Sequence, residues 1–410
     1  MQLEQQAKTL DTQDLLADKK RLFSLPENVI YLDGNSLGAM PAAAQQRAEE
    51  VVREQWGNGL ITSWNQHNWI GLPEKVGNKI GALTGARDGQ VVCCDSISVN
   101  LFKVLSAALK MRPDRKVIAT TEDNFPTDIY MAEGLIAQLG DRRSLKFIDE
   151  RNIIDTLSED IAVLMLTQVN FRTGFRQDMK AITEAAHEKG ILVVWDLAHS
   201  AGAFEVELDA CSADFAVGCT YKYLNGGPGA PAFIYVAERH QRHYAQPLSG
   251  WMGHASPFDF NPHYEGAKGV TQNLSGTPGV IGMSVLDAAL DVFKNVSLKH
   301  VRDKSEALMS WFEQCLQHHG LDSELECCSP PVVTRGSQLA FRHHEAYAIC
   351  QAWIAQGVIA DFRAPDILRI GFAPLYLSFS DITEAVSRLA EVMRQKAYLQ
   401  PEFQQRQAVT

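Results

Sequence analysis

The feature that most constrains the fold is a regular alternation of short apolar segments with helical patterns between about Gln45 and Gly279. Such alternation is typical of βα units, whose strands form a mostly parallel sheet covered by helices. The candidate strands span residues 91–95, 116–121, 161–168, 191–196, 215–220 and 232–236. The candidate helices include residues 99–111, 129–140 and 178–190. The sequence therefore predicts an α/β domain with a mainly parallel central sheet.

The pattern changes after Gly279, which indicates a second domain. A chain of 410 residues is too long for one hydrophobic core, and a long helical run at 280–296 is expected to bridge the two parts. Helical patterns then mix with strand-like segments at 337–343 and 367–372. We expect a domain division into an N-terminal segment (1–45), a large domain (46–285) and a small α+β domain (286–410).

Charge and apolar content narrow the class of protein. The formal net charge of −11 at pH 7 argues against a nucleic-acid partner, because phosphate contacts need a basic face. A polar N-terminal stretch, and no apolar run of about 18 residues or more, predict a soluble, cytoplasmic protein without a membrane partner. The eight cysteines show no spacing typical of a zinc site, so we expect buried or free thiols and no bound metal.

Polar residues at the ends of the predicted strands locate a candidate site, because ligands bind beyond the carboxyl ends of strands in open α/β sheets. Asp196 ends one strand and Lys222 follows the next, so both side chains are expected to face one crevice. A carboxylate and an amine there match what pyridoxal phosphate (PLP) requires: the lysine binds the aldehyde, and the carboxylate pairs with the protonated pyridine nitrogen. Taken singly, each residue also has a structural interpretation, as does the nearby His199.

The turn within residues 93–105 offers a place for the cofactor's phosphate. Ser96 and Ser98 stand where a strand gives way to a helix, and hydroxyl groups together with helix N-terminal N–H groups bind a dianion. Either serine is alternatively a simple helix cap. In the next strand-to-helix turn, Phe125 is a candidate to stack on the cofactor ring and Asp128 to hydrogen-bond a ring substituent. A single phenylalanine is more typical of a core.

Longer segments resemble one family of PLP-dependent enzymes. Residues 195–203 (WDLAHSAGA) and 218–236 (GCTYKYLNGGPGAPAFIYV) resemble the class V branch of the aspartate-aminotransferase fold. Within that branch, four further segments resemble the kynureninases: YLDGNSLGAMP (31–41), EDNFPTDIYMAEGL (122–135), SGWMGH (249–254) and DFRAPDILRIGFAPLYLSF (361–379). The resemblance implies the PLP-dependent transferase fold (fold type I), with a mainly parallel seven-stranded sheet in the large domain and a smaller α+β C-terminal domain.

The resemblance also implies an activity, a cofactor and a partner. Kynureninases are PLP-dependent hydrolases that cleave the Cβ–Cγ bond of L-kynurenine to give anthranilate and L-alanine, or act in the same way on 3-hydroxy-L-kynurenine. They serve tryptophan degradation and NAD biosynthesis. A homodimer with active sites at the subunit interface is therefore expected, while the preferred substrate and the metabolic role stay open.

Carried over position by position, the resemblance implies individual roles. Lys222 matches the lysine that binds PLP and removes the substrate's Cα proton, and Tyr221 a tyrosine that contacts the phosphate and acts as an acid. Asp196 matches the partner of the pyridine nitrogen, and Arg369 the residue that grips the substrate's α-carboxylate. Other positions expected at the cofactor are Ile97, Ser98, Phe125, Asp128, Thr167, His199, Trp251 and Thr277, the last two from the partner subunit. Those expected near the substrate's aromatic end are Ser36 and Trp64, with His67 as the alternative to Trp64.

Other functions fit parts of the same pattern. A cysteine desulfurase or class V aminotransferase would use the same scaffold, and a desulfurase needs a reactive cysteine, for which the Cys327–Cys328 pair is the candidate. A non-catalytic relative would be expected to have lost the lysine, aspartate or arginine of the site. A metal hydrolase built on Asp196 and His199 lacks further ligands at a recognisable spacing.

Overall fold

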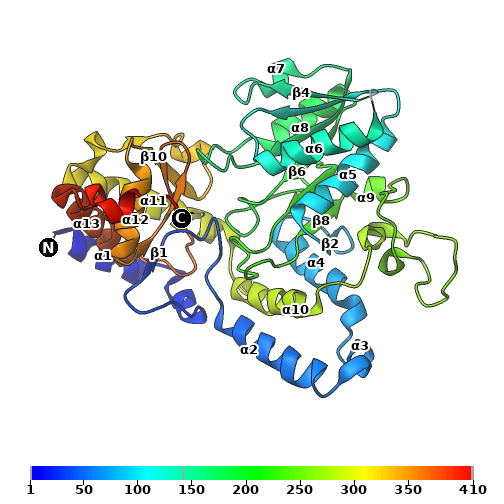
Figure 1. The fold of residues 1–410 in the computed structure, drawn as a ribbon, viewed down its shortest axis with the longest axis horizontal. Coiled ribbons are helices and arrows are strands. Elements are labelled where there is room, and N and C mark those ends of the chain that lie inside the picture. Colours follow the sequence, from blue (N-terminus) through cyan, green and yellow to red (C-terminus); the bar gives the residue numbers. More distant parts are fainter. Residues whose placement is uncertain (1, 141–142, 408–410) are drawn as a thin grey trace.

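A seven-stranded sheet forms the centre of the large domain (Figure 1). The structure is a computed structural model that describes residues 2–140 and 143–407. In spatial order the strands are β2 (Val91–Cys93), β8 (Phe233–Val236), β7 (Phe215–Gly218), β6 (Leu192–Asp196), β5 (Ile161–Thr167), β3 (Val117–Thr121) and β4 (Ser144–Ile148). Neighbours from β7 to β4 pair in parallel, whereas β8 runs antiparallel to both β7 and β2. The predicted mainly parallel sheet is confirmed.

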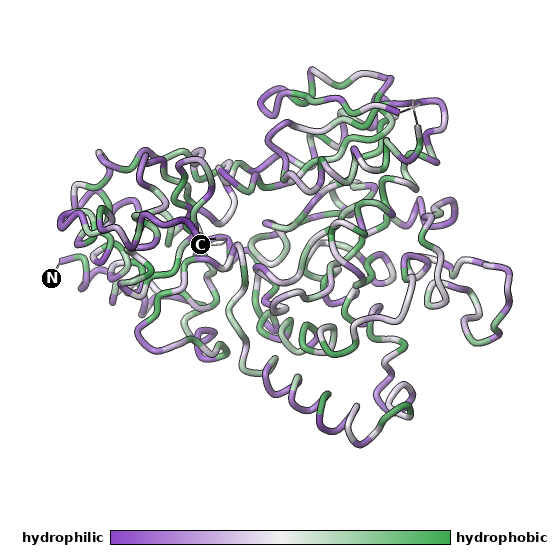
Figure 2. Tube along the Cα trace, viewed as in Figure 1, coloured by the Kyte–Doolittle hydropathy of each residue, from purple (hydrophilic) through white to green (hydrophobic). Residues whose placement is uncertain are grey.

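Helices cover both faces of this sheet, because alternate side chains of a buried strand point to opposite faces. In β6, Val193 and Trp195 belong to the core on one face, and Leu192 and Val194 to the core on the other. Figure 2 shows the hydrophobic segments gathered mainly inside the domain. One face is covered by α4 (Leu72–Leu83), α8 (Met179–Glu188) and α10 (Val280–Ala289), and the other by α5 (Ile97–Met111) and α6 (Pro126–Leu139). The remaining helices here are α2 (Ala42–Glu50), α3 (Ser63–Gln66), α7 (Ile153–Thr156) and α9 (Glu238–Gln241).

The small domain packs helices against an antiparallel sheet. In spatial order its strands are β12 (Asp361–Arg363), β13 (Ile367–Gly371), β10 (Gln338–Arg342) and β9 (Glu326–Cys327). Its helices are α11 (Leu298–His319), α12 (Ala346–Ala355), α13 (Phe379–Gln395) and α14 (Pro401–Gln404). This arrangement matches the α+β character that the sequence predicts for the C-terminal part.

The N-terminal segment joins the two domains. Helix α1 (Gln2–Gln13) packs against α13, and β1 (Ile30–Tyr31) pairs in parallel with β11 (Val358–Ile359). A few residues later, the Gly38 N–H donates to the Tyr221 carbonyl at 2.7 Å. A Cβ atom at Gly38 would lie 2.2 Å from the Lys222 carbonyl oxygen, so only glycine permits this approach. The N-terminal segment therefore contacts both the small domain, through β1, and the loop that carries Lys222, through Gly38.

Two elements differ from the sequence-based expectation. Strand β4 has no counterpart among the six predicted strands, because it lies at the edge of the sheet and only Ile148 in it is buried, which leaves a weak apolar pattern. The single helix predicted at 280–296 is wrong. Helix α10 ends at Ala289, a short 3₁₀ turn follows, and Asn295 takes a left-handed backbone conformation (φ 57°) before α11 begins. The domains are thus joined by a broken, partly non-helical connection.

Candidate active site

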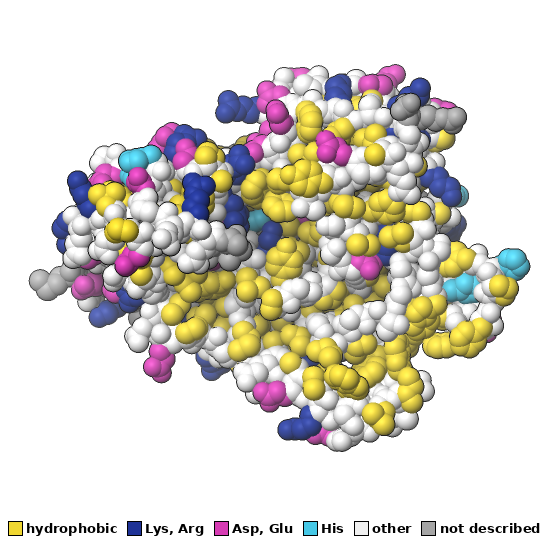
Figure 3. Space-filling view, in the orientation of Figure 1, with side chains coloured by type: hydrophobic (Ala, Val, Ile, Leu, Met, Phe, Trp, Pro, Cys, Tyr) yellow, Lys and Arg dark blue, Asp and Glu magenta, His cyan; other side chains and the backbone are white. Residues whose placement is uncertain are grey.

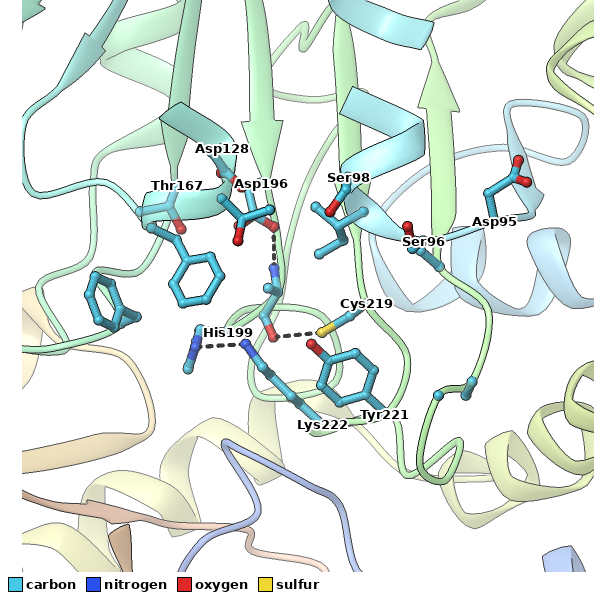
Figure 4. A pocket seen from close by; sticks show the side chains of 18 residues that line it. Asp95, Ser96, Ser98, Asp128, Thr167, Asp196, His199, Cys219, Tyr221 and Lys222 are labelled. Carbon is cyan, nitrogen blue, oxygen red and sulfur yellow. Dashed lines mark hydrogen bonds between the residues drawn. The ribbon is translucent and has the colours of Figure 1, made fainter. Parts of the chain in front are cut away.

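A pocket of about 240 Å³ opens at the carboxyl ends of the central strands (Figure 4). Its walls come from the turn between β2 and α5, the first turn of α6, the ends of β5 and β6, and the segment after β7. This is where the topology of an open α/β sheet favours a ligand. Nine of the predicted site residues line it: Ile97, Ser98, Phe125, Asp128, Thr167, Asp196, His199, Tyr221 and Lys222.

Lys222 directs its amine into this pocket. Its Nζ lies 2.9 Å from His199 Nε2 and 6.0 Å from the centre of the Phe125 ring. Burial, together with the positive charge of Lys222, lowers the pKa of His199 well below its usual value. The imidazole is therefore neutral and accepts a hydrogen bond from the lysine. His199 Nδ1 is buried without a protein partner in the described chain, so it is free for a ligand.

Two buried carboxyl groups face the same space. Asp196, at the end of β6, accepts a hydrogen bond from the Ala198 N–H at 2.8 Å. Burial raises the pKa of Asp196 to about 6, although the nearby Lys222 acts in the opposite direction. Asp128 is fully buried, and among the described residues neither of its carboxyl oxygens has a hydrogen-bond donor. Burial, and then the charge of Asp196, raise the pKa of Asp128 well above its usual value. Both groups would gain from a ligand that brings a cation or N–H or O–H donors.

The N-terminus of α5 forms another part of the wall. Ser96 is the N-cap of this helix and accepts a hydrogen bond from the Val99 N–H at 3.4 Å, so its capping role is confirmed while its side chain also lines the pocket. Backbone N–H groups in the first turn of a helix have no partner within the helix. Those of Ile97 and Ser98 therefore offer donors to an anion at the pocket.

Tyr221 stands on the other side of Lys222, with its ring centre 5.9 Å from the lysine Nζ. The neighbouring Cys219 and burial raise the pKa of the Tyr221 hydroxyl, so it is a neutral phenol that retains its proton at working pH. Cys219, Thr127 and Phe171 also line the pocket and were not predicted. Cys219 precedes Lys222 by three residues within the quoted family segment, a signal that could have identified it.

Phe171 extends the aromatic wall of the pocket. Its ring meets that of Phe125 edge-on, with the centroids 5.3 Å apart and the planes at 86°. The Phe171 carbonyl accepts a hydrogen bond from Arg369 Nη1 at 2.5 Å, which connects the pocket to the small domain. Since Phe171 lies in the loop after β5, no periodic pattern in the sequence marks it.

Arg369 and Ser36, both expected at the substrate, meet each other at this domain junction. Arg369 Nη2 donates to Ser36 Oγ at 2.8 Å, and its Nε donates to Asp361 Oδ1 at 2.9 Å. A second bond from Nη2 reaches Asp361 Oδ2, so the pair is bidentate. The guanidinium is buried, and the partially exposed Arg363 pairs with the same carboxylate at 2.7 Å. Asp361, which holds Arg369 in place, is not among the site residues predicted from the sequence.

Three further predicted residues lie apart from the pocket in the described part of the single chain. Trp64 and Trp251 contact each other, with ring centroids 6.1 Å apart. Thr277 is exposed, and so is His67, the alternative to Trp64. None of the four belongs to the pocket wall formed by residues 2–140 and 143–407 of one chain.

The described residues can also be compared with the requirements of a metal site, a membrane span and a reactive cysteine. Within the described residues, no group of three or more His, Cys, Asp or Glu side chains is arranged to hold a metal ion. No described helix has the length and apolar character needed to cross a membrane. All eight cysteines are free, and burial raises the pKa of both Cys327 and Cys328.

Comparison with known proteins identifies the family. The chain is 47% identical over 416 residues to a kynureninase of Burkholderia pseudomallei (strain 1106a), covering 100% of both chains. It is also 47% identical over 407 residues to a kynureninase of Pseudomonas fluorescens, covering 98% of both. The chain belongs to the kynureninase family. The model of the kynureninase C-terminal domain matches residues 301–389, within the small domain.

Solved structures of other enzymes share the fold with this kynureninase family member. A C-DES mutant with glycine covalently linked to its PLP cofactor superposes with a TM-score of 0.78 at 16% identity, covering 91% of this chain and 99% of its own. The cysteine desulfurase CsdA of Escherichia coli gives a TM-score of 0.77 at 19% identity, covering 93% and 98%. At such low identity these matches establish the fold alone, which is the fold type I architecture predicted from the sequence.

Proposed function

We propose that this chain is a PLP-dependent kynureninase, a hydrolase that cleaves L-kynurenine, or its 3-hydroxy form, to anthranilate or 3-hydroxyanthranilate and L-alanine. The observation that carries the proposal is the meeting of the Lys222 amine with two buried, acceptor-rich carboxyl groups in one pocket. That pocket lies in a chain 47% identical to kynureninases over its full length.

The pocket fits PLP at each end. Asp196 would pair with the protonated ring nitrogen, and the unpartnered oxygens of Asp128 would receive donors from the ring and its substituents. Since His199 Nε2 accepts from Lys222, its unpartnered Nδ1–H would donate to an acceptor on the cofactor. Phe125 offers a ring to stack on, and the first turn of α5 would hold the phosphate. Ile97, Ser98 and Thr167 complete the cofactor contacts. When bound, PLP supplies an electron sink for the carbon atoms next to the substrate's amino group.

The protein's own groups would then bind, orient and move protons. Lys222 is the base for the substrate's Cα proton, since its amine lies in the pocket beside the neutral His199. Tyr221 retains its proton and would donate it to the carbon that becomes the methyl group of alanine.

Arg369 would receive the substrate's α-carboxylate. A guanidinium has five N–H groups, and four hydrogen bonds already link Arg369 to Asp361, Ser36 and Phe171. Full bidentate binding of substrate would therefore require Arg369 to exchange one of its two neutral partners, the Phe171 carbonyl or the Ser36 hydroxyl. Ser36 and Trp64 are proposed at the aromatic end of the substrate.

A homodimer would complete the site. Figure 3 shows apolar side chains exposed over the region of α2, α3 and α10. Large hydrophobic residues are exposed within residues 40–61 and 251–260, among them Met40, Val52, Trp56, Leu60, Ile61, Trp251, Phe258 and Phe260. Contiguous apolar surface of this kind marks a protein interface. We propose that the partner subunit covers it and supplies its own Trp251 and Thr277 to the cofactor. The cytoplasmic location and a role in tryptophan degradation or NAD biosynthesis belong to the same proposal.

The direct test is to load the protein with PLP and follow its products. We expect fluorescence of anthranilate with L-kynurenine, and no sulfide with L-cysteine. The Lys222→Ala variant should lose anthranilate formation. Sulfide release without anthranilate would instead identify a desulfurase, for which the raised pKa of the Cys327 and Cys328 thiols is unfavourable. A comparison of kcat/KM for kynurenine and 3-hydroxykynurenine would assign the substrate.

A further inference from the structure

Lys103, on α5, is a completely buried lysine that does not belong to the pocket wall. Its Nζ donates to Asp95 Oδ2 at 2.6 Å and to the Asn273 carbonyl oxygen at 2.5 Å. A buried ammonium carries a large desolvation cost, and a methionine or leucine of similar volume would fill the same space without that cost. The charge at this position therefore calls for an explanation beyond packing.

The explanation lies in Asp95. This residue lines the pocket directly before Ser96, and its side chain is 32% exposed. Figure 4 shows Asp95 and Ser96 together at one end of the pocket, apart from the group around His199. Asp95 has a left-handed backbone conformation (φ 47°), and its carbonyl accepts a hydrogen bond from the Ala232 N–H at 2.8 Å, so the turn is held in position. A fixed, unpaired carboxylate here would repel an anion at the N-terminus of α5.

The second contact of Lys103 keeps its charge in place. Asn273 ends the 3₁₀ segment η6 (Gly269–Asn273). Both polar atoms of its side chain are hydrogen-bonded: Oδ1 accepts from the buried Tyr244 hydroxyl at 2.6 Å, and Nδ2 donates to the Val270 carbonyl at 2.9 Å. Because these two bonds hold the Asn273 side chain, the backbone carbonyl of Asn273 is a well-positioned acceptor for the Lys103 amine. Lys103 therefore pairs with Asp95 while its own side chain stays outside the pocket wall.

We propose that Lys103 is a positioning residue that makes the pocket selective for a phosphate-bearing aldehyde by neutralising Asp95. The inference rests on the proposed function, in which the phosphate of PLP lies at the first turn of α5. Lys103 lies outside the pocket wall, yet its positive charge would allow the Asp95 carboxylate and the phosphate dianion of PLP to lie close together. A purely structural lysine would support every ligand of the pocket equally.

The test compares PLP with pyridoxal, which carries the same aldehyde but no phosphate. Dissociation constants for both would be measured by absorbance on the apo forms of the wild type, Lys103→Met, Asp95→Asn and the double variant. We expect Lys103→Met to weaken PLP binding by roughly tenfold or more and pyridoxal binding by about twofold at most. Asp95→Asn should recover most of the loss in the double variant.

Equal losses for PLP and pyridoxal, an unchanged PLP affinity, or no recovery in the double variant would overturn the inference. If Lys103→Met does not fold, Asp95→Asn alone decides, because it should keep or increase the preference for PLP over pyridoxal, and a reduced preference would contradict the idea. If the wild type binds neither aldehyde, the proposed function itself fails. If the wild type binds PLP more tightly than pyridoxal and the Lys103→Met variant does so to the same extent, only the role of Lys103 is refuted.

Discussion

Removing the hydroxyl of Tyr221 separates proton donation from cofactor binding. The Tyr221→Phe variant keeps the ring, whose centre lies 5.9 Å from Lys222 Nζ, and loses only the O–H group. In the structure this hydroxyl lies beside the Cys219 thiol, and its pKa is raised, so the wild-type phenol carries its proton throughout the working range. The substitution therefore removes the proton donor and, at most, one hydrogen bond from the hydroxyl to the cofactor.

These two losses differ in size. A lost neutral hydrogen bond is worth about 1 kcal/mol, so PLP affinity should fall by roughly fivefold or less. The loss of a general acid lowers the rate by about 10²–10⁴-fold, which corresponds to about 3–5 kcal/mol in the activation free energy. We therefore expect kcat to fall far more than the affinity for the cofactor.

The assay measures kcat from anthranilate fluorescence at saturating L-kynurenine and PLP, and the PLP dissociation constant from absorbance of the apo variant. The matched control is Tyr223→Phe. Tyr223 is buried and donates to the Ser337 carbonyl at 2.8 Å, away from the pocket, so its loss should lower stability and leave kcat nearly unchanged. A Tyr221→Phe kcat within about threefold of wild type would refute the acid role.

Three further results are expected. Because the pKa of Asp196 is raised to about 6, its carboxyl is protonated below that pH and cannot pair with a cationic ring nitrogen. PLP affinity of the apo protein should thus fall as the pH drops below about 6, and Asp196→Asn should lack this component; equal pH profiles would contradict it. Asp361→Ala strands the buried Arg369 and should lower the free energy of unfolding by about 3–5 kcal/mol, whereas a loss below about 1 kcal/mol in urea denaturation would show the pair to be unimportant. Trp64→Ala should raise the KM for kynurenine more than His67→Ala does, and the reverse order would assign the ring pocket to His67.

The centre of the fold could be predicted because its strands carry strong local signals. Strands β5, β6 and β7 are buried along their whole length, so each reads as an uninterrupted apolar run. The polar residues that end them, among them Asp196, fall at the pocket for a topological reason that holds for any such sheet. Strand β4 was not predicted from the sequence, because an edge strand buries few side chains and so has a weak apolar pattern.

Other parts depend on contacts between distant residues. The Arg369–Ser36 hydrogen bond joins positions 333 residues apart, and the pairing of Arg369 with Asp361 depends on the register of β12 against β13. Lys103, which is buried and paired with Asp95, has the appearance of an ordinary lysine on an amphipathic helix in the sequence. Resemblance located Arg369 and Ser36, but only the structure shows which groups hold them.

The role of Lys222 is tested most directly by finding which lysine carries the cofactor. The PLP-loaded protein would be reduced with borohydride, digested and mapped by mass spectrometry. We expect the reduced cofactor on Lys222, whose amine lies in the pocket beside His199. A label on another lysine, such as the buried Lys103, or no label on any lysine, would contradict it.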